Sequence, residues 1–205
     1  MSLGIVRGDV WTVTLDRPER ANALSAELVE ALHGVLDEAA SARPEALVLR
    51  GNDRHFAAGF DLGGLSTETD ASLALRFLRI GLLLERLIAA PYRTVAVAEG
   101  AAVGAGADLV LACDHRLVDP AVTLRFPGSA FGVALGTVRR AELGAALTTG
   151  VPSTLPDVLR AESPARPPHD GDAELAALAR SVAVPGLRDR IAAYRTALTE
   201  AGIRG

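Results

Sequence analysis

Three segments each place glycine or other small residues after a short apolar run and carry residue types suited to binding an anion or moving a proton. They read LDRPERANAL at residues 15–24, LVLRGNDRHFAAGFDLGGL at 47–65 and VAEGAAVGAGADLVLACD at 97–114. A glycine-rich turn that opens a helix leaves backbone N–H groups unpaired and adds the positive end of the helix dipole. Such a turn suits an oxyanion, and the N–H groups near Ala105 and Gly106 are the candidates. The alternative is that these glycines serve only close packing before a buried helix.

The elements that position these segments follow from hydrophobic periodicity. Alternating apolar and threonine residues in VWTVTL, with Ile5 and Val6 before them, predict an opening hairpin. The remaining pattern predicts helices over about 25–40 and 71–90, buried strands at 46–49 and 94–98, and a buried helix at 107–113. Strands therefore alternate with helices, which is typical of an α/β protein whose strands are largely parallel and covered.

The chain changes character after Gly150. Residues 151–172 contain five prolines and are predicted to be mostly irregular. Two helices are expected beyond them, at 173–182 and 187–201, separated by Pro185 and Gly186. We therefore divide the chain into a core at 1–150 and a proline-rich segment with C-terminal helices at 151–205.

Composition narrows the classes of partner. The chain has 205 residues, 49% of them hydrophobic, and a net charge of −4 with both signs interspersed, which is not the pattern of a nucleic-acid binder. The longest weakly charged run, 94–113, is interrupted by Glu99, Asp108 and glycines, which argues against a membrane span. The single cysteine, Cys113, excludes an intramolecular disulfide and is interpreted as a buried small residue. A single cysteine fits a reducing compartment, so we expect a cytoplasmic protein. No histidine stands at metal-ligand spacing from another, so we expect no metal.

Taken in order, the three segments resemble the loops of the enoyl-CoA hydratase/isomerase family, the crotonase superfamily. RPERANAL matches the first loop of the family, HFAAGFDL the second and EGAAVGAGADLVLACD the third, and the resemblance covers about residues 5–147. It implies a crotonase-like spiral of ββα units with a short helical C-terminal region, assembled as a homotrimer or a dimer of trimers. It also implies an acyl-CoA ligand, with no cofactor beyond the coenzyme A of the substrate thioester.

The resemblance places individual roles on residues of this chain. Family members polarise the thioester carbonyl with two backbone N–H groups to stabilise an enolate, and these fall on Phe60 and Ala105. Arg20, Ala21, Ala58 and Asp61 then lie along the coenzyme A moiety. Backbone donors tolerate side-chain change, so a phenylalanine at 60 does not abolish the pair. Its ring either narrows the pocket or fills core space beside the loop.

The family's hydrating members use two carboxylates, and only one has a counterpart here. Asp108 matches the first, although it is one methylene shorter than glutamate, a difference of about 1.5 Å that matters for proton transfer. The second position is occupied by Gly128, in FPGSAFG. The neighbouring Ser129 is a poor general acid near neutral pH, and arginines such as Arg116 and Arg125 cannot give up a proton. Asp108 is either a base or a structural helix-terminal aspartate.

Two functions from different classes follow. The first is an enzyme on acyl-CoA thioesters that needs an enolate and at most one carboxylate, as in double-bond isomerisation, decarboxylation or slow hydration through Asp108. The second is an acyl-CoA-binding protein without turnover. A third class, acyl transfer through a Ser-His-Asp triad, is unsupported because no serine stands in a nucleophile-elbow pattern.

Overall fold

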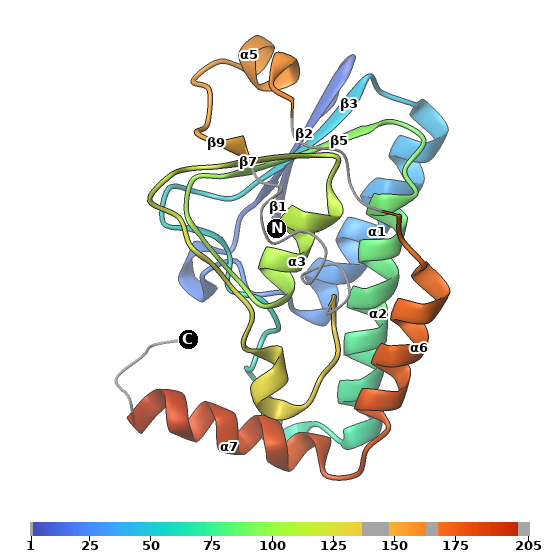
Figure 1. Ribbon diagram of the computed structural model, residues 1–205, viewed down its shortest axis with the longest axis vertical. Coiled ribbons are helices and arrows are strands. Elements are labelled where there is room, and N and C mark those ends of the chain that lie inside the picture. Colours follow the sequence, from blue (N-terminus) through green and yellow to red (C-terminus); the bar gives the residue numbers. More distant parts are fainter. Residues whose placement is uncertain (1, 137–147, 163–167, 201–205) are drawn as a thin grey trace.

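The computed structural model describes residues 2–136, 148–162 and 168–200, and these form two sheets with helices packed against them (Figure 1). The larger sheet has the strand order β1 (Leu3–Val6), β2 (Val10–Leu15), β3 (Ala46–Arg50), β5 (Arg93–Ala98), β7 (His115–Val118) and β9 (Thr148–Thr149). The smaller sheet orders β4 (His55–Ala57), β6 (Ala101–Val103) and β8 (Leu124–Arg125). The pair β1–β2 is the antiparallel hairpin predicted from the sequence, and the other pairs are parallel.

The chain winds as a spiral in which three successive turns after the β1–β2 hairpin each give one strand to each sheet. After β3 and β4 comes helix α2 (Asp70–Ile88), after β5 and β6 comes α3 (Ala105–Ala112), and after β7 and β8 comes the 3-10 helix η3 (Pro127–Phe131). Successive turns are held in parallel register, with Ala46 beside Arg93 and Val95 beside His115. The expected α/β spiral of ββα units is therefore confirmed.

Helices α1 (Ala26–Ala42), α2 and α3 build the main hydrophobic core beside the larger sheet. Ser25 caps α1, because its Oγ accepts the N–H of Leu28. Helix α3 is buried along its whole length, so its first turn is fixed within the molecule. Each fully buried leucine or phenylalanine of this core contributes about 1.5–3 kcal/mol. The core thus fixes the ends of α2 and α3 that face the loops.

The proline-rich segment contains a helix that the sequence did not predict, α5 (Leu155–Arg160). Thr154 caps it by accepting the N–H of Asp157, and Pro156 lies in the first turn, where a missing N–H costs nothing. Val158 packs with Val48 and Val97 in a second apolar cluster. The expectation of a mostly irregular segment is wrong for this helix, while residues 163–167 lie outside the described residues.

The two expected C-terminal helices are present as α6 (Gly171–Val182) and α7 (Leu187–Glu200). Figure 1 shows α6 alongside α2 and α7 crossing the end of the molecule below η3. Their buried residues, including Leu178, Leu187 and Ile191, belong to the same core as the sheet helices. The end of the second predicted helix, Ala201, lies outside the described residues.

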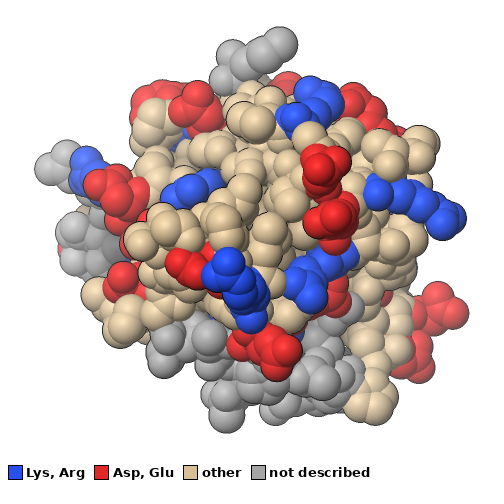
Figure 2. Space-filling model, turned by 90° about the horizontal axis from the view of Figure 1, so that it is seen from above, with Lys and Arg blue, Asp and Glu red and all other residues tan. Residues whose placement is uncertain are grey.

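The described surface carries both signs of charge. On the face shown in Figure 2, arginine side chains and acidic side chains are interspersed rather than gathered into one basic patch. Among the described residues, no helix combines the length and the apolar character needed to cross a membrane.

Candidate functional site

Three segments far apart in the sequence meet at the ends of the small-sheet strands. A Cβ built on Gly59 would stand 2.5 Å from the carbonyl oxygen of Val103 and 3.2 Å from the backbone nitrogen of Ala105. Gly104 donates its N–H to the carbonyl of Arg125 at 2.7 Å. The second loop, the start of α3 and the segment leading into η3 are therefore in direct contact.

The two N–H groups expected at Phe60 and Ala105 lie on these touching segments. Neither donates a hydrogen bond to an acceptor in the described part of the chain, whereas the next N–H along the second loop, that of Asp61, bonds to Leu24. Each of the two follows a glycine with positive φ, +85° at Gly59 and +54° at Gly104. Ala105 is the first residue of α3, where an N–H has no acceptor within the helix. In the bridge between Leu24 and Phe60, the hydrogen bonds use the Gly59 carbonyl and the Asp61 N–H, which leaves the Phe60 N–H out of the ladder.

The glycines of the third loop divide between the two roles that the sequence left open. A Cβ on Gly106 would come within 2.2 Å of the carbonyl oxygen of Ala57, so this glycine allows α3 to pack against β4. Gly104 has no such contact, because the nearest atom to a built Cβ is the Cδ of Pro127 at 3.8 Å. Gly104 therefore serves the turn, and Gly106 serves the packing.

The acidic positions of the site are unequal. Asp108 lies in the first turn of α3 and is 1% exposed. Gly128 lies in η3 and is half-buried, and a Cβ there would have one neighbour within 4 Å, the carbonyl oxygen of Val133 at 3.4 Å. Ser129 beside it is exposed. The η3 segment thus has space for a side chain at Gly128 but presents no carboxylate there.

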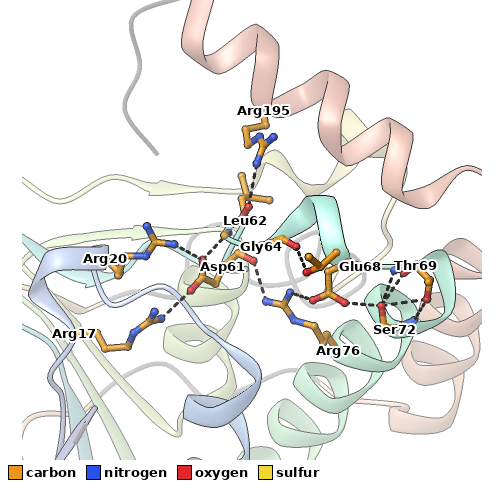
Figure 3. Close-up of polar contacts among 12 residues, drawn as sticks. Arg17, Arg20, Asp61, Leu62, Gly64, Glu68, Thr69, Ser72, Arg76 and Arg195 are labelled. Atoms are coloured by element: carbon orange, nitrogen blue, oxygen red, sulfur yellow. Dashed lines mark hydrogen bonds and ion pairs between the residues drawn. The ribbon is translucent and has the colours of Figure 1, made fainter.

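The first and second loops are joined through Asp61, as Figure 3 shows. Its carboxylate accepts hydrogen bonds from Arg17 at 3.0 Å and from the N–H of Gly63 at 2.8 Å, and Arg20 approaches it to 3.6 Å. Burial raises the pKa of Asp61, but the Gly63 N–H and the Arg17 guanidinium outweigh burial and hold that pKa below its ordinary value. Asp61 is therefore an anion that orders both loops, and the Arg20 side chain remains half exposed beside it.

Ala21 and Ala58, predicted to lie along the ligand, contact one another through the backbone. The N–H of Ala58 donates to the carbonyl of Ala21 at 2.9 Å. Next to them is a residue that the sequence analysis missed, Asn22, which is fully buried. Its Nδ2 donates to the carbonyls of His55 and Phe56, and its Oδ1 accepts the N–H of Arg17. The available signal was an asparagine in a turn, because asparagine tolerates the left-handed backbone found here, with φ of 54°.

The Phe60 side chain packs between two neighbouring residues of α2. Its ring stacks on Phe77 with centroids 4.1 Å apart, and the Arg76 guanidinium carbon lies 4.2 Å from the Phe60 centroid. Arg76 is itself held by Glu68 at 2.7 Å and by the carbonyl of Asp61 at 2.9 Å. The ring thus packs against the core and also borders the loop that carries the Phe60 N–H.

Two residues named in the sequence analysis, Arg116 and Cys113, are buried away from the surface. Arg116 is fully buried and donates to the carbonyls of Cys113 and Asp114, so its guanidinium holds the backbone between α3 and β7. Cys113 is buried with its Sγ near the carbonyl of Leu109, as the composition indicated. No group of three or more His, Cys, Asp or Glu side chains placed to hold a metal ion occurs among the described residues.

Comparison with known proteins agrees with this fold and this arrangement of loops. The family model for enoyl-CoA hydratase/isomerase matches residues 6–144, more than half of the chain. The protein belongs to the enoyl-CoA hydratase/isomerase family, the crotonase superfamily.

The relatives include proteins named as hydratases and a protein named as a decarboxylase. A solved structure of a family member from Bordetella parapertussis is 37% identical, with a TM-score of 0.86, covering 95% of this chain and 98% of that one. The probable enoyl-CoA hydratase echA6 of Mycobacterium tuberculosis is 39% identical over 134 residues, covering 65% of this chain and 53% of that protein. Human ethylmalonyl-CoA decarboxylase is 31% identical over 141 residues, covering 65% of this chain and 45% of the relative. The chain thus spans about half the length of the curated relatives it matches.

Proposed function

We propose that this protein binds acyl-CoA thioesters, with the thioester carbonyl oxygen accepting the N–H groups of Phe60 and Ala105. The observation that carries the proposal is this pair of N–H groups, each placed after a positive-φ glycine, on two segments in contact and without an acceptor among the described residues. When charge develops on the carbonyl oxygen, each donor of such a pair is worth about 2.7–4 kcal/mol. The half-exposed Arg20 and the backbone at Ala21 and Ala58 would line the coenzyme A moiety.

We infer that, if the protein converts an acyl-CoA substrate, the reaction proceeds through an enolate and uses a single carboxylate, that of Asp108. Asp108 would take a proton from the carbon next to the thioester carbonyl, leaving negative charge on the oxygen held by the two N–H groups. Water addition needs a second acid–base group, and Gly128 supplies none. Isomerisation, or decarboxylation in which carbon dioxide leaves to form the same enolate, therefore fits the site better than hydration. The hydratase and decarboxylase names among the relatives support acyl-CoA thioesters as the substrate class.

The second candidate is an acyl-CoA-binding protein without turnover. Gly128 and the shortened acid at Asp108 favour it, because both departures remove proton-transfer capacity while leaving the backbone donors in place. Membership of the family is the basis on which we propose a homotrimer or a dimer of trimers, and the single cysteine is the basis on which we propose a cytoplasmic location. Light scattering on the purified protein measures the first of these directly.

The experiment that separates the two candidates uses enoyl-CoA thioesters of several chain lengths in deuterated water, with every product read by mass spectrometry. Deuterium uptake or double-bond migration without water addition supports enolate chemistry. Unchanged thioesters, together with ligand-induced thermal stabilisation, support the binding protein. No stabilisation by any thioester refutes the proposal itself.

Variants assign the roles within this experiment. Asp108→Asn is expected to abolish turnover while leaving acyl-CoA binding nearly intact, and loss of neither property would remove Asp108 as the base. Asp157→Asn, in the exposed pair with Arg160, is the matched control and leaves both unchanged. A bulky residue in place of Ala105 is expected to block the ligand, since its backbone is one of the two donors.

A further inference from the structure

A continuous row of four aromatic rings runs from the Phe60 loop to the C-terminal helix α7. Phe60 stacks on Phe77 at 4.1 Å, Phe77 meets Phe131 at 6.2 Å, and Phe131 meets Tyr194 at 5.1 Å between ring centroids. These residues come from the second loop, α2, η3 and α7. We call Phe60, Phe77, Phe131 and Tyr194 the aromatic row.

The first ring of the row is held on both faces. The Phe77 ring lies nearly parallel to it, with an interplanar angle of 13°, and the Arg76 guanidinium carbon stands 4.2 Å from its centroid. Two groups at these distances cannot share one face, so Phe60 is sandwiched between them. Arg76 is in turn fixed by Glu68 and by the carbonyl of Asp61, as Figure 3 shows. The Phe60 ring is therefore anchored to α2 rather than free to swing away.

The inner rings are equally constrained. Phe77 is 2% exposed and Phe131 is 6% exposed. The outer end is held because Arg190 of α7 donates to the carbonyl of Phe131 at 3.0 Å. At the N-terminus of α7, the Asp70 carboxylate accepts the N–H groups of Gly186 and Leu187. Close-packed rings of this kind yield space only by moving the elements that carry them.

The aromatic row begins at Phe60, whose N–H is one of the two candidate donors, and it passes η3, which lies beside the loop that carries the other donor, Ala105. Phe60 supplies its own N–H, while Phe131 lies three residues beyond Gly128 in η3. The start of η3 stands beside the third loop, because a Cβ on Gly104 would lie 3.8 Å from Pro127. An acyl chain that leaves the carbonyl between Phe60 and Ala105 in the direction of η3 therefore meets these rings within a few carbons.

We propose that the aromatic row closes the acyl pocket and restricts this protein to thioesters of short acyl chains. The inference rests on the proposed function, because it takes the Phe60 and Ala105 N–H groups as the position of the thioester carbonyl. It deepens that function by naming the substrate class and four specificity-determining side chains. Phe60 contributes twice, through its backbone to the carbonyl and through its ring to the length limit.

The proposal is tested by dissociation constants for acetyl-, butyryl-, octanoyl- and palmitoyl-CoA, measured by calorimetry on the full chain. In an unrestricted apolar pocket, affinity rises about fourfold with each buried methylene, so octanoyl-CoA would bind roughly 200-fold more tightly than butyryl-CoA. The aromatic row predicts that the rise stops at butyryl-CoA, with octanoyl-CoA bound no more tightly.

Two variants open the row at different rings. Phe60→Ala removes the sandwiched ring but keeps the backbone N–H, and Phe77→Leu removes the face against which it stacks. Each is expected to tighten octanoyl-CoA relative to butyryl-CoA by at least tenfold, and the second variant serves if the first does not fold. Leu75→Ala, on the exposed side of α2, is the matched control and keeps the wild-type ratio.

The outcomes are distinct. A wild-type affinity that climbs through octanoyl-CoA, or a length limit that survives in both row variants, overturns the proposal while leaving acyl-CoA binding intact. Failure of all four thioesters and of free coenzyme A to bind the wild type refutes the proposed function, and the length limit with it. A length limit in the wild type that both variants relax supports it.

Discussion

Replacing Gly59 with alanine tests the backbone geometry on which the candidate site depends. A residue with a side chain at φ of +85° carries a conformational cost of about 1–3 kcal/mol. The new Cβ would also stand 2.5 Å from the carbonyl oxygen of Val103, a backbone atom that cannot swing aside. Overpacking of this kind adds about 1–3 kcal/mol. We therefore expect Gly59→Ala to lower the free energy of unfolding by about 2–6 kcal/mol, a large part of the 5–15 kcal/mol of an ordinary domain.

Two further glycine variants separate strain from steric contact. Gly104 also has positive φ, but the nearest atom to a built Cβ is 3.8 Å away, so Gly104→Ala should cost only the conformational term, about 1–3 kcal/mol. Gly34 lies exposed within α1 with nothing within 4 Å of a built Cβ. Gly34→Ala should therefore stabilise the protein by about 0.5–1 kcal/mol.

Urea unfolding of the three variants measures these differences, and thermal stabilisation by an acyl-CoA thioester reports on the site. The expected order of stability is Gly34→Ala, wild type, Gly104→Ala and Gly59→Ala. A cost for Gly59→Ala below about 1 kcal/mol, or no greater than that of Gly104→Ala, would refute the close approach of the second loop to Val103. Unchanged thioester binding in a folded Gly59→Ala variant would refute the placement of the Phe60 N–H.

Three more predictions concern the acids, the loop anchor and the effect of pH. Gly128→Glu adds the missing second acid, and the single Cβ contact at 3.4 Å leaves room for it. We expect enoyl-CoA hydration, measured as loss of enoyl absorbance, to rise by about 10²-fold or more. No gain would show that η3 does not face the reacting carbons. Asp61→Asn should lower the free energy of unfolding in urea by about 1.5–3 kcal/mol, because it removes the charge that orders Arg17. The control Glu38→Gln, in the exposed pair with Arg7, should cost at most about 1 kcal/mol. Equal costs would contradict the role of Asp61 in anchoring the loops. Burial lowers the pKa of His33 below 6.5, so the unfolded chain binds more protons than the folded one. The free energy of unfolding should therefore fall as pH drops below 6.5, and less steeply in His33→Gln. Equal slopes in the two proteins would assign the pH dependence to other groups.

Much of the fold could be predicted from the sequence, because many of its helices and strands are determined by the residues within them. The hairpin, the capped helix α1, the buried strands β3 and β5 and the buried helix α3 all follow from periodicity and capping over a few residues. The strands of the smaller sheet were not visible in this way. β4, β6 and β8 are two or three residues long and lie in glycine-rich loops, so their pairing depends on contacts between distant segments. Helix α5 was missed because a proline in the first turn was interpreted as a sign of irregular chain.

The candidate site divides along the same line. The sequence by itself determined which residue types are available, including the glycines before Phe60 and Ala105, the aspartate at 108 and the lack of an acid at Gly128. Only the tertiary structure decided which groups meet. Gly59 touches Ala105, Asp61 joins Arg17 to the second loop, and Phe60 is sandwiched between Arg76 and Phe77. The N–H groups at the site and the ring stacks arise where segments from separate turns of the spiral pack together. Periodicity within one segment does not predict which distant segment it will contact.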